Sequence, residues 1–238
     1  MTLAAVRAIE SAQVVAFPAV REGASSMAAA IARPWIRAEQ RQLPLVFPMV
    51  EAAEPRRQAW HRAADVLAAE VAQGQAVVLL CEGDSSLFAT SSYVVLALQE
   101  RHPRCSLRVI PGITAISAAA AAGAWPLALQ QDQSLVMPCP DHPEGLQAAL
   151  GSAARQGRVL ALLKLGHRWS WVRPLLEQRG LLPHTLFAER VGWSDQIVCP
   201  ADHCSEGQRP YFSLLLICLL YTSPSPRDYA ASRMPSSA

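Results

Sequence analysis

The chain alternates between short apolar runs and longer segments in which apolar residues recur every three or four positions. The short runs are typical of strands, and the longer spacing is typical of helices with one buried face. In the first half of the chain the predicted strands are residues 14–18, 43–47, 76–81 and 106–110. The predicted helices between them are residues 1–10, 26–32, 55–74, 87–101 and 114–122.

Local signals support several of these boundaries. Ser25 and Ser26 are candidate N-caps for a helix that ends at Ala32, before Pro34. The run 76–81 is continuously apolar, as expected for a strand covered on both faces. The helix predicted over 55–74 ends at a glycine and carries an apolar stripe formed by Trp60, Ala63, Ala64, Leu67 and Val71.

The predicted strands and helices follow a different order in the second half of the chain. Predicted strands lie at residues 135–137, 159–163, 186–191, 197–198 and 211–217, and helices at 144–156 and 169–179. The last strands follow one another without helices, which indicates a mixed sheet with antiparallel pairs. We therefore expect an α/β protein with a mostly parallel N-terminal lobe, residues 1–112, and a mixed C-terminal lobe, residues 113–217.

Both ends of the chain depart from this pattern. It opens on an amphipathic helix with Leu3, Val6 and Ile9 on one face, where an alternating fold would have a strand, so we expect a first strand to be missing. Residues 218–238, CLLYTSPSPRDYAASRMPSSA, have no periodicity. We interpret them as a non-native translated extension, with a genuine disordered tail as the alternative, and leave them out of the fold prediction.

Composition narrows the class of protein. The net charge of +2 over 238 residues disfavours a nucleic-acid binder that relies on broad phosphate neutralisation. The six cysteines form no Cys-x-x-Cys pair and several lie in apolar runs, which favours a reducing cytoplasm over a disulfide framework. No apolar run has the length of a membrane span, and we expect no membrane partner and no signal peptide.

Standard catalytic and metal motifs are missing from the sequence. Cys199, Asp202, His203 and Cys204 have no standard zinc spacing, so no metal site is predicted. Ser117 lacks the Gly-x-Ser-x-Gly context of a hydrolase nucleophile. The chain has neither a P-loop nor a Gly-x-Gly-x-x-Gly, which disfavours kinases, ATPases and NAD-dependent dehydrogenases.

Two strand–turn–helix segments in the first half are candidates for a binding site. In the first, Gly83 would let a ligand approach the backbone, and Asp84 would either cap the helix or accept a hydrogen bond from a ligand hydroxyl. Ser85 offers another cap. In the second, Pro111-Gly112 precedes the small-residue helix 114–122, which would pack either against the core or against a flat ligand.

Two strand ends in the second half carry charged residues. Lys164 is the only lysine in the chain, and it is either a solvated surface charge or part of a pocket. Glu189 and Arg190 are neighbours at the end of a predicted strand, where adjacent side chains point to opposite faces. We therefore expect the two to have different roles, with structural salt bridges as the alternative to a site.

Taken in order, these segments resemble the tetrapyrrole methylases. That family has a Gly-Asp-Pro turn, a Val-x-Pro-Gly-Ile/Val-Thr segment, a Met-Lys strand end and a Glu-Arg strand. They correspond here to Gly83-Asp84-Ser85, Val109–Thr114, Leu163-Lys164 and Glu189-Arg190, and the resemblance extends from about Thr2 to Ile217. Segments 5–18, 34–36, 43–49 and 81–84 point to the branch that methylates precorrin-2 at C-20.

Two departures from the family pattern are visible. The usual opening strand with its Gly-x-Gly-Pro-Gly-Asp-Pro loop is absent, as expected if the sequence is truncated before Met1. Ser85 stands where the family most often has proline, so the turn lacks a fixed φ angle.

The resemblance implies a methyl transfer from S-adenosylmethionine, held between two lobes mostly by backbone groups. The methyl passes in line to a meso carbon of the tetrapyrrole, so alignment and exclusion of water are the main tasks of the protein. No general base is identified. The implied cofactor contacts are Gly83, Asp84, Ser85, Thr114, Ala115 and Leu163. The candidate contacts for substrate carboxylates are Arg33, Arg37, Lys164, Arg168 and Glu189.

Other functions stay open. The same fold can serve another substrate, either the cobalt form (cobalt-factor II) or another corrin position; the low net charge disfavours RNA. Alternatively, the truncated chain is a non-catalytic cofactor-binding fragment with an unpaired sheet edge. The resemblance also implies a homodimer.

Overall fold

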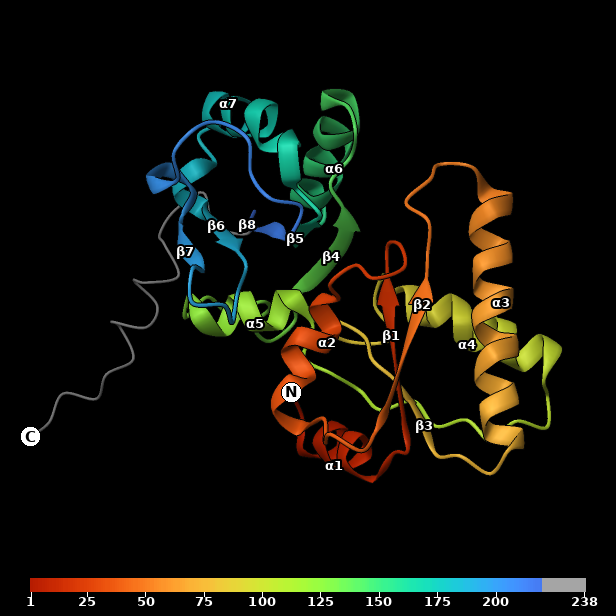
Figure 1. Cartoon of the computed structure of the whole chain (residues 1–238). Helices are drawn as coiled ribbons and strands as arrows, with labels where there is room; N and C mark the ends of the chain where they lie inside the picture. Colours follow the sequence, from red (N-terminus) through yellow and green to blue (C-terminus); the bar gives the residue numbers. More distant parts are fainter. Residues whose placement is uncertain (220–238) are drawn as a thin grey trace, which may run out of the picture. The chain divides into compact units, whose positions relative to one another are not determined.

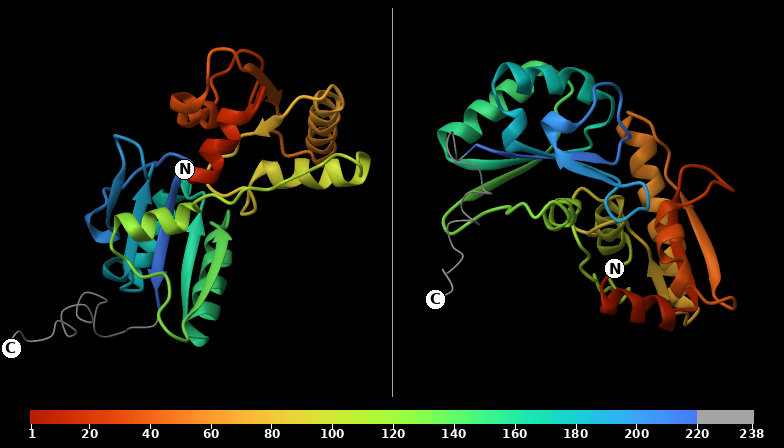
Figure 2. Two further views of the ribbon diagram at one scale, coloured as in Figure 1. Left: turned by 90° about the horizontal axis from the view of Figure 1, so that it is seen from below. Right: turned by 90° about the vertical axis from the view of Figure 1, so that its left-hand side faces the viewer.

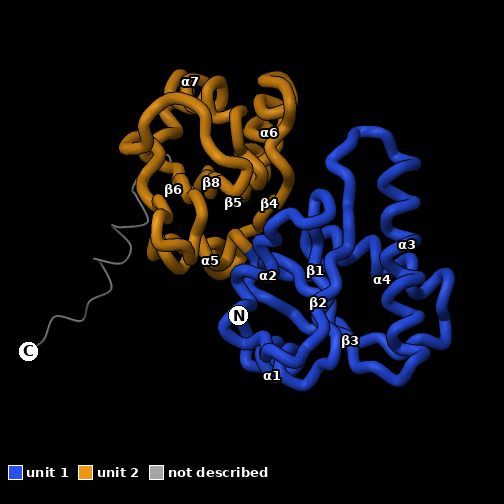
Figure 3. The backbone as a smooth tube through the Cα atoms, viewed as in Figure 1, with its two compact units in different colours: residues 1–114 blue, residues 115–238 orange. Residues whose placement is uncertain are grey.

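The computed structural model describes residues 1–219, which form two compact units (Figure 3). Unit 1 is Met1–Thr114, and unit 2 begins at Ala115. This division lies two residues after the boundary expected from the sequence. Residues 220–238, which make up most of the segment interpreted as a non-native tail, lie outside the described residues.

Unit 1 is a three-stranded parallel sheet with helices on both faces (Figure 1). The strand order is β2-β1-β3, and Val14 at the start of the central strand is opposite Arg41 on one side and Val77 on the other. The strands are β1 Val14–Ala19, β2 Arg41–Val46 and β3 Val77–Leu79. The helices are α1 Leu3–Ser11, α2 Met27–Ala32, α3 Ala53–Ala72 and α4 Thr90–Arg101, with a 3-10 turn η1 at Arg33–Trp35.

The buried residues of β1 alternate between two apolar clusters, since successive side chains of a strand point to opposite faces. Ala16 packs in the cluster formed with α3 and α4, which includes Leu67 and Val94. Val15 and Phe17 pack in the cluster formed with α1 and α2. The stripe predicted on the helix over 55–74 is confirmed in part. Ala63, Ala64 and Leu67 are buried on α3, whereas Trp60 and Val71 are half-buried.

Polar contacts fix the starts of the first two helices. The hydroxyl of Ser26 accepts a hydrogen bond from the Ala29 N–H, so Ser26 is the N-cap of α2. Thr2 caps α1 in the same way. Of the three apolar residues predicted on one face of α1, only Ile9 is buried, and Leu3 is exposed.

Two strand predictions for unit 1 need correction. The segment 106–110 is not a strand: it pairs with no neighbour, and Leu107 and Val109 are 41% and 49% exposed. The strand predicted over 76–81 is shorter, Val77–Leu79, and only half-buried. In the described residues β3 is an edge of the sheet, so it is not enclosed by strands on both sides.

Unit 2 is a five-stranded mixed sheet of order β4-β5-β8-β6-β7. The pair β4–β5 is parallel, and the pairs β5–β8, β8–β6 and β6–β7 are antiparallel, which confirms the mixed sheet expected from the sequence. The strands are β4 Gln133–Pro138, β5 Arg158–Leu163, β6 Thr185–Glu189, β7 Ile197–Pro200 and β8 Ser213–Cys218. The helices are α5 Ala115–Ala122, α6 Pro143–Arg155 and α7 Trp169–Gln178, with 3-10 turns η2 Gly166–Arg168, η3 Leu182–His184 and η4 Ala201–His203.

Helices cover both faces of this sheet, with α6 and α7 on one side and α5 on the other (Figures 1 and 2). On β5, Leu160 and Leu162 pack against α6 and α7, whereas Ala161 and Leu163 face α5. Strand β8 ends at the buried Cys218, and Leu219 packs against the core. Residues 218 and 219, the first two of the segment 218–238, therefore belong to the folded unit, contrary to the expected start of a tail at 218.

Candidate functional site

In unit 1, the two candidate turns lie against each other. Gly83 has a φ of +68°, in the left-handed region that favours glycine. A Cβ atom on Gly112 would lie 2.0 Å from the Gly83 carbonyl oxygen, so the two backbones meet at a distance only glycine allows. A Cβ on Gly83 would lie 3.5 Å from the Ile113 carbonyl oxygen. The close approach therefore explains the glycine at position 112, and the left-handed φ explains the glycine at position 83.

Asp84 fastens this contact with its carboxylate. Oδ2 accepts a hydrogen bond from the Gly112 N–H at 2.8 Å, and Oδ1 accepts from the Ser86 N–H at 2.9 Å and from the Ser86 hydroxyl. The Ser86 hydroxyl, the Ser86 N–H and the Gly112 N–H together lower the pKa of Asp84 below its ordinary value. Asp84 therefore caps the turn and also joins it to the 111–114 segment. We call these contacts the Asp84 clamp.

Ser85 joins the same turn to α4. Its hydroxyl donates to the Ile110 carbonyl at 3.4 Å. Its own carbonyl accepts from the hydroxyls of Ser91 and Ser92 at 3.1 and 2.9 Å. Proline at this position could not donate to Ile110, so the serine supplies a tie that replaces the fixed φ of proline.

The end of the second segment holds Thr114 and Ala115. Thr114 is half-buried and is the last residue of unit 1. Ala115 is the exposed first residue of α5 in unit 2. The small residues of α5 are explained in part by packing, because Ala119 is fully buried against the sheet and a Cβ on Gly123 would lie 2.6 Å from a Leu186 methyl group.

Two arginines proposed from the sequence follow α2. Arg33 lies in η1 and is exposed. Arg37 is exposed and forms an ion pair with Glu39 at 3.2 Å between Nε and Oε1. Exposed pairs of this kind contribute little to stability, so Arg37 can exchange this partner for another carboxylate at low cost.

In unit 2, the carboxyl end of β5 places Leu163, Lys164 and Arg168 close together. Leu163 is buried in the cluster that faces α5. Lys164 has a φ of +59°, and its Nζ lies 5.8 Å from the centre of the Tyr211 ring. Arg168 donates from Nη1 to the Lys164 carbonyl at 3.2 Å and forms an ion pair with Asp141 through Nε and Nη2.

Glu189 is buried at the end of β6 and is paired inside unit 2. The Arg209 Nη1 lies 3.8 Å from its Oε2, too far for a hydrogen bond, and the two side chains are 13% and 9% exposed respectively. Glu189 Oε2 and Arg209 Nε have no hydrogen-bond partner. Arg190, the next residue, instead pairs with Asp195 and lies over the Trp193 ring. The two neighbours therefore have different partners, but strand alternation is not the reason, because β6 ends at Glu189 and Arg190 has a φ of +49°.

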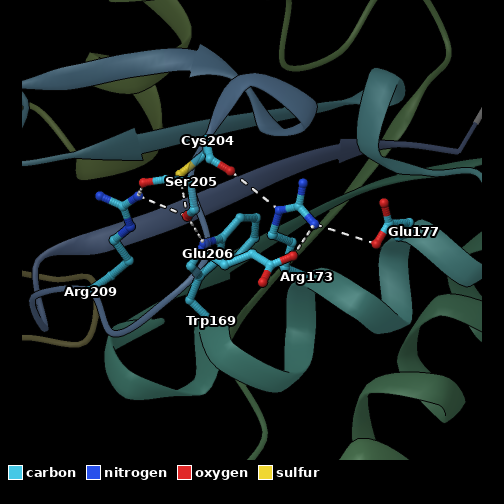
Figure 4. A network of polar contacts seen from close by, with 7 residues as sticks. All are labelled: Trp169, Arg173, Glu177, Cys204, Ser205, Glu206 and Arg209. Atoms are coloured by element: carbon cyan, nitrogen blue, oxygen red, sulfur yellow. Dashed lines mark hydrogen bonds and ion pairs between the residues drawn. The ribbon is translucent and has the colours of Figure 1, made fainter.

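Arginines also fasten the segment 204–206 that precedes β8 (Figure 4). Arg173 donates to the Cys204 carbonyl at 3.3 Å and pairs with Glu206. Arg209 donates to the Ser205 carbonyl at 2.8 Å, which also accepts from the Trp169 indole at 3.0 Å. The segment 204–206 leads to Tyr211, the residue beside Lys164. These hydrogen bonds therefore help to position Tyr211.

The cysteines near this segment are poor nucleophiles. Burial raises the pKa of Cys204 to about 11 and also raises the pKa of Cys199, so both thiols stay protonated at neutral pH. Among the described residues, no group of three His, Cys, Asp or Glu side chains is arranged to hold a metal ion.

Sequence reasoning missed several partners of the proposed site residues. Asp141, Tyr211 and Arg209 were not singled out, although each contacts a residue that was. Asp141 carried a usable signal, since it follows the end of β4, the parallel neighbour of β5. Tyr211 and Arg209 lie far along the chain in an irregular segment, and only the antiparallel return of β8 brings them to β5 and β6.

Comparisons with known proteins give a consistent result. The family model for Tetrapyrrole (Corrin/Porphyrin) Methylases matches residues 1–202. The chain is 29% identical over 225 residues to the cobalt-precorrin-2 C(20)-methyltransferase of Salmonella typhimurium, covering 91% of this chain and 90% of that protein. It is 26% identical to the precorrin-2 C(20)-methyltransferase of Sinorhizobium sp., covering 91% and 89% of the two chains.

A solved structure supports the fold. The uroporphyrin-III C-methyl transferase of Thermus thermophilus, complexed with S-adenyl homocysteine, superposes with a TM-score of 0.53 at 20% identity, covering 91% of this chain and 90% of that one.

None of the described helices has the length and apolar character needed to cross a membrane.

Proposed function

Because the chain belongs to the tetrapyrrole (corrin/porphyrin) methylases, we propose that it transfers a methyl group from S-adenosylmethionine to C-20 of precorrin-2. The relatives named for C-20 methylation support this choice, since they match nearly the whole of both chains. The S-adenyl homocysteine bound by the Thermus thermophilus protein supports the choice of methyl donor. The sulfonium of that donor supplies an already activated methyl group.

The observation in the structure that carries the proposal is the close contact of the two glycine turns of unit 1. Gly83 is exposed and has no side chain, so a ligand can reach the backbone of the turn directly. The Asp84 clamp holds that backbone at fixed geometry against the 111–114 segment. A preorganised backbone surface of this kind suits a cofactor held by main-chain groups, because binding then requires little reorganisation.

We assign the individual contacts as part of this proposal. Gly83, Asp84, Ser85 and Thr114 of unit 1 are the proposed cofactor contacts there, and Ala115 and Leu163 those of unit 2. The contacts already made by the Asp84 carboxylate indicate that it acts on the cofactor mainly by shaping the turn.

For the substrate we propose contacts between its carboxylates and Arg33, Arg37 and Lys164. Arg168, the other arginine suggested by the sequence for this role, is already paired with Asp141. A cation that meets a carboxylate forms a charge-assisted hydrogen bond, which is stronger than a neutral one. Glu189 stays a weaker proposal, since it is buried and faces Arg209.

The first experiment is calorimetric titration with S-adenosylmethionine and S-adenosylhomocysteine. We expect binding by the natural chain and its loss in Gly83→Trp, whose indole would cover the turn. Gly180→Trp is a matched control, because Gly180 is also exposed, has a φ of +67° and has open space around it. Equal binding by both variants would contradict the placement of the cofactor at Gly83.

The second experiment is methyl transfer with precorrin-2 and with cobalt-precorrin-2 under anaerobic conditions, with the product position read by NMR. Methylation at C-20 of either substrate supports the proposal, and the better substrate decides between the metal-free and cobalt forms. Methylation at another position would favour a related methylase with a different substrate. Cofactor binding without any transfer would favour a non-catalytic cofactor-binding chain.

We further propose that the protein is a cytoplasmic homodimer. The free thiols of Cys81, Cys105, Cys139, Cys199 and Cys204 support a reducing compartment. Sedimentation equilibrium would give the oligomeric state, and a mass equal to one chain would contradict the dimer.

A further inference from the structure

The conformation of Lys164 is unusual for its residue type. A φ of +59° is in the left-handed region, which is sterically unfavourable for a residue with a Cβ atom and freely accessible to glycine. Lys164 is also the only lysine in a chain with 21 lysines and arginines together. A strained position that glycine would fill more easily, occupied by the single lysine, indicates that the ammonium group has a function there.

The backbone on either side explains why the strain persists. The Leu163 carbonyl accepts from the Cys139 N–H at 2.7 Å, and the Leu165 N–H donates to the Ser213 carbonyl at 3.0 Å. These bonds tie one neighbour of Lys164 to the end of β4 and the other to the start of β8. The chain must turn sharply between the two ties, and Lys164 is the residue at the turn.

Arg168 binds the backbone carbonyl of Lys164 at this turn. Its Nη1 donates to the Lys164 carbonyl at 3.2 Å, and Asp141 binds its Nε and Nη2. The Arg168 side chain is only 20% exposed, and its charge is compensated by Asp141. Arg168 is therefore committed to partners within unit 2. Among residues 1–219, the Lys164 ammonium lies near the Tyr211 ring and pairs with no carboxylate.

The Tyr211 ring presents the ammonium without neutralising it. A cation 5.8 Å from a ring centre gains a weak attraction that orients the side chain and leaves its hydrogen-bond donors available. Lysine is a compact charge with three rotatable donors, which suits a carboxylate that approaches from a variable direction.

We propose that Lys164 binds a carboxylate of the tetrapyrrole substrate and that Arg168, anchored by Asp141, is a positioning residue that fixes the Lys164 backbone. This rests on the proposed function for the identity of the substrate. The proposal gives Lys164 and Arg168 different roles, although both were candidate carboxylate contacts from the sequence. Arg168 acts through Lys164 and does not form a second, independent carboxylate contact.

A double-mutant cycle tests the separation of roles. Lys164→Gln is expected to raise the KM for precorrin-2 about tenfold or more, as for loss of a charge-assisted hydrogen bond, with kcat and the KM for S-adenosylmethionine little changed. Arg168→Gln is expected to raise the same KM several-fold. The double variant should be no worse than Lys164→Gln alone, because the effect of Arg168 passes through Lys164.

Two kinetic outcomes would overturn the assignment. If the effects of the two single variants multiply in the double variant, Arg168 is an independent substrate contact. If Lys164→Gln leaves the KM for precorrin-2 unchanged, Lys164 binds no carboxylate. Arg158→Gln is the matched control, since Arg158 lies at the opposite end of β5 and donates to Gln133 across the parallel pair. It should leave the kinetics unchanged.

A second readout does not depend on turnover. Because the chain has one lysine, protein labelled with [1-13C]lysine gives a single carbonyl NMR signal, that of Lys164. Arg168→Gln and Asp141→Asn should shift this signal, and Arg158→Gln should not. An unchanged signal in Arg168→Gln would overturn the positioning role.

The same label keeps failure of the inference distinct from failure of the proposed function. With 13C at the lysine ε-carbon, titration with uroporphyrin III, a tetrapyrrole polycarboxylate, should shift the Lys164 signal. The Arg158→Gln control should show the same shift as the natural chain at each concentration. If the chain methylates nothing and binds no S-adenosylhomocysteine but this shift occurs, the proposed function fails and the carboxylate site stands. If methylation occurs and the shift is absent, the inference alone fails.

Discussion

The two units fasten the loops at the ends of their strands with opposite chemistry. In unit 1, one carboxylate collects donors: Asp84 accepts from the backbone of Ser86 and Gly112. In unit 2, guanidinium groups donate to backbone carbonyls. Arg168 donates to the Lys164 carbonyl, and Arg209 donates to the Ser205 carbonyl. Arg173 does the same for Cys204.

The difference follows from the backbone geometry at each place. The N–H groups of Ser86 and Gly112 lie in irregular chain outside any helix, so an acceptor is needed there. In unit 2 the irregular segments leave carbonyls unpaired next to an apolar core, and arginine can bury its stem there while its head supplies several donors. A carboxylate therefore serves where N–H groups need an acceptor, and arginine serves where carbonyls need donors.

The largest effect is expected where unit 2 buries a charge. Arg209→Met would leave Glu189 buried without its partner, and removing one member of a buried pair costs about 3–5 kcal/mol. Urea unfolding followed by circular dichroism would measure the loss. The double variant Arg209→Met with Glu189→Gln should recover much of it, because no uncompensated charge remains. A double variant as unstable as the single one would show that Arg209 acts through Ser205 and not through Glu189.

The next effect concerns the glycine contact of unit 1. Gly112→Ala would place a Cβ atom 2.0 Å from the Gly83 carbonyl oxygen, so the turns must separate. We expect a loss of about 1–3 kcal/mol in stability, together with weaker S-adenosylhomocysteine binding by calorimetry. Gly151→Ala is the control, because its Cβ would meet only the flexible end of Arg155 within α6, where alanine favours the helix. Normal binding by Gly112→Ala would mean that the turns need not touch.

A smaller effect tests the carboxylate of the Asp84 clamp. Asp84→Asn keeps one acceptor oxygen and loses the charge, so we expect a loss of about 1 kcal/mol, read as faster hydrogen exchange at residues 83–86 and 110–114. Asp132→Asn makes the same change at a carboxylate that accepts from the Leu129 N–H, and it should leave those residues unchanged. Unchanged exchange in Asp84→Asn would show that the charge is not needed.

The smallest effect is a pH dependence in unit 1. Hydrogen bonds from Arg101 and His102 lower the pKa of Asp65 from 3.8 to about 2. The native protein therefore binds the proton less tightly than the unfolded chain, and this stability is present above about pH 4 and is lost as the pH falls toward 2. The pair is exposed, so the contribution is expected to be below about 1 kcal/mol.

The measurement for Asp65 compares the natural chain with Asp65→Asn in urea unfolding at several pH values. Their difference in stability should shrink as the pH falls from 4 toward 2. A difference that grows on acidification would have the wrong sign for a lowered pKa and would contradict the ion pair.

Much of the fold could be predicted because local pattern and burial agree. The stripe on α3, the Ser26 cap and the antiparallel strands of unit 2 were all visible in residue spacing. The prediction for residues 106–110 was wrong because an apolar run of strand length does not specify a neighbour, and here no strand pairs with it.

By itself, the sequence determined the order of the elements, the helical faces, the family motifs and the positions of Gly83, Asp84 and Lys164 in the chain. These properties depend on residues close together in sequence, where periodicity and turn chemistry act directly. Only the tertiary structure decided that Gly112 touches Gly83 and that Asp141 anchors Arg168. Those contacts join segments more than twenty residues apart, and no local pattern encodes which distant backbone group a side chain will meet.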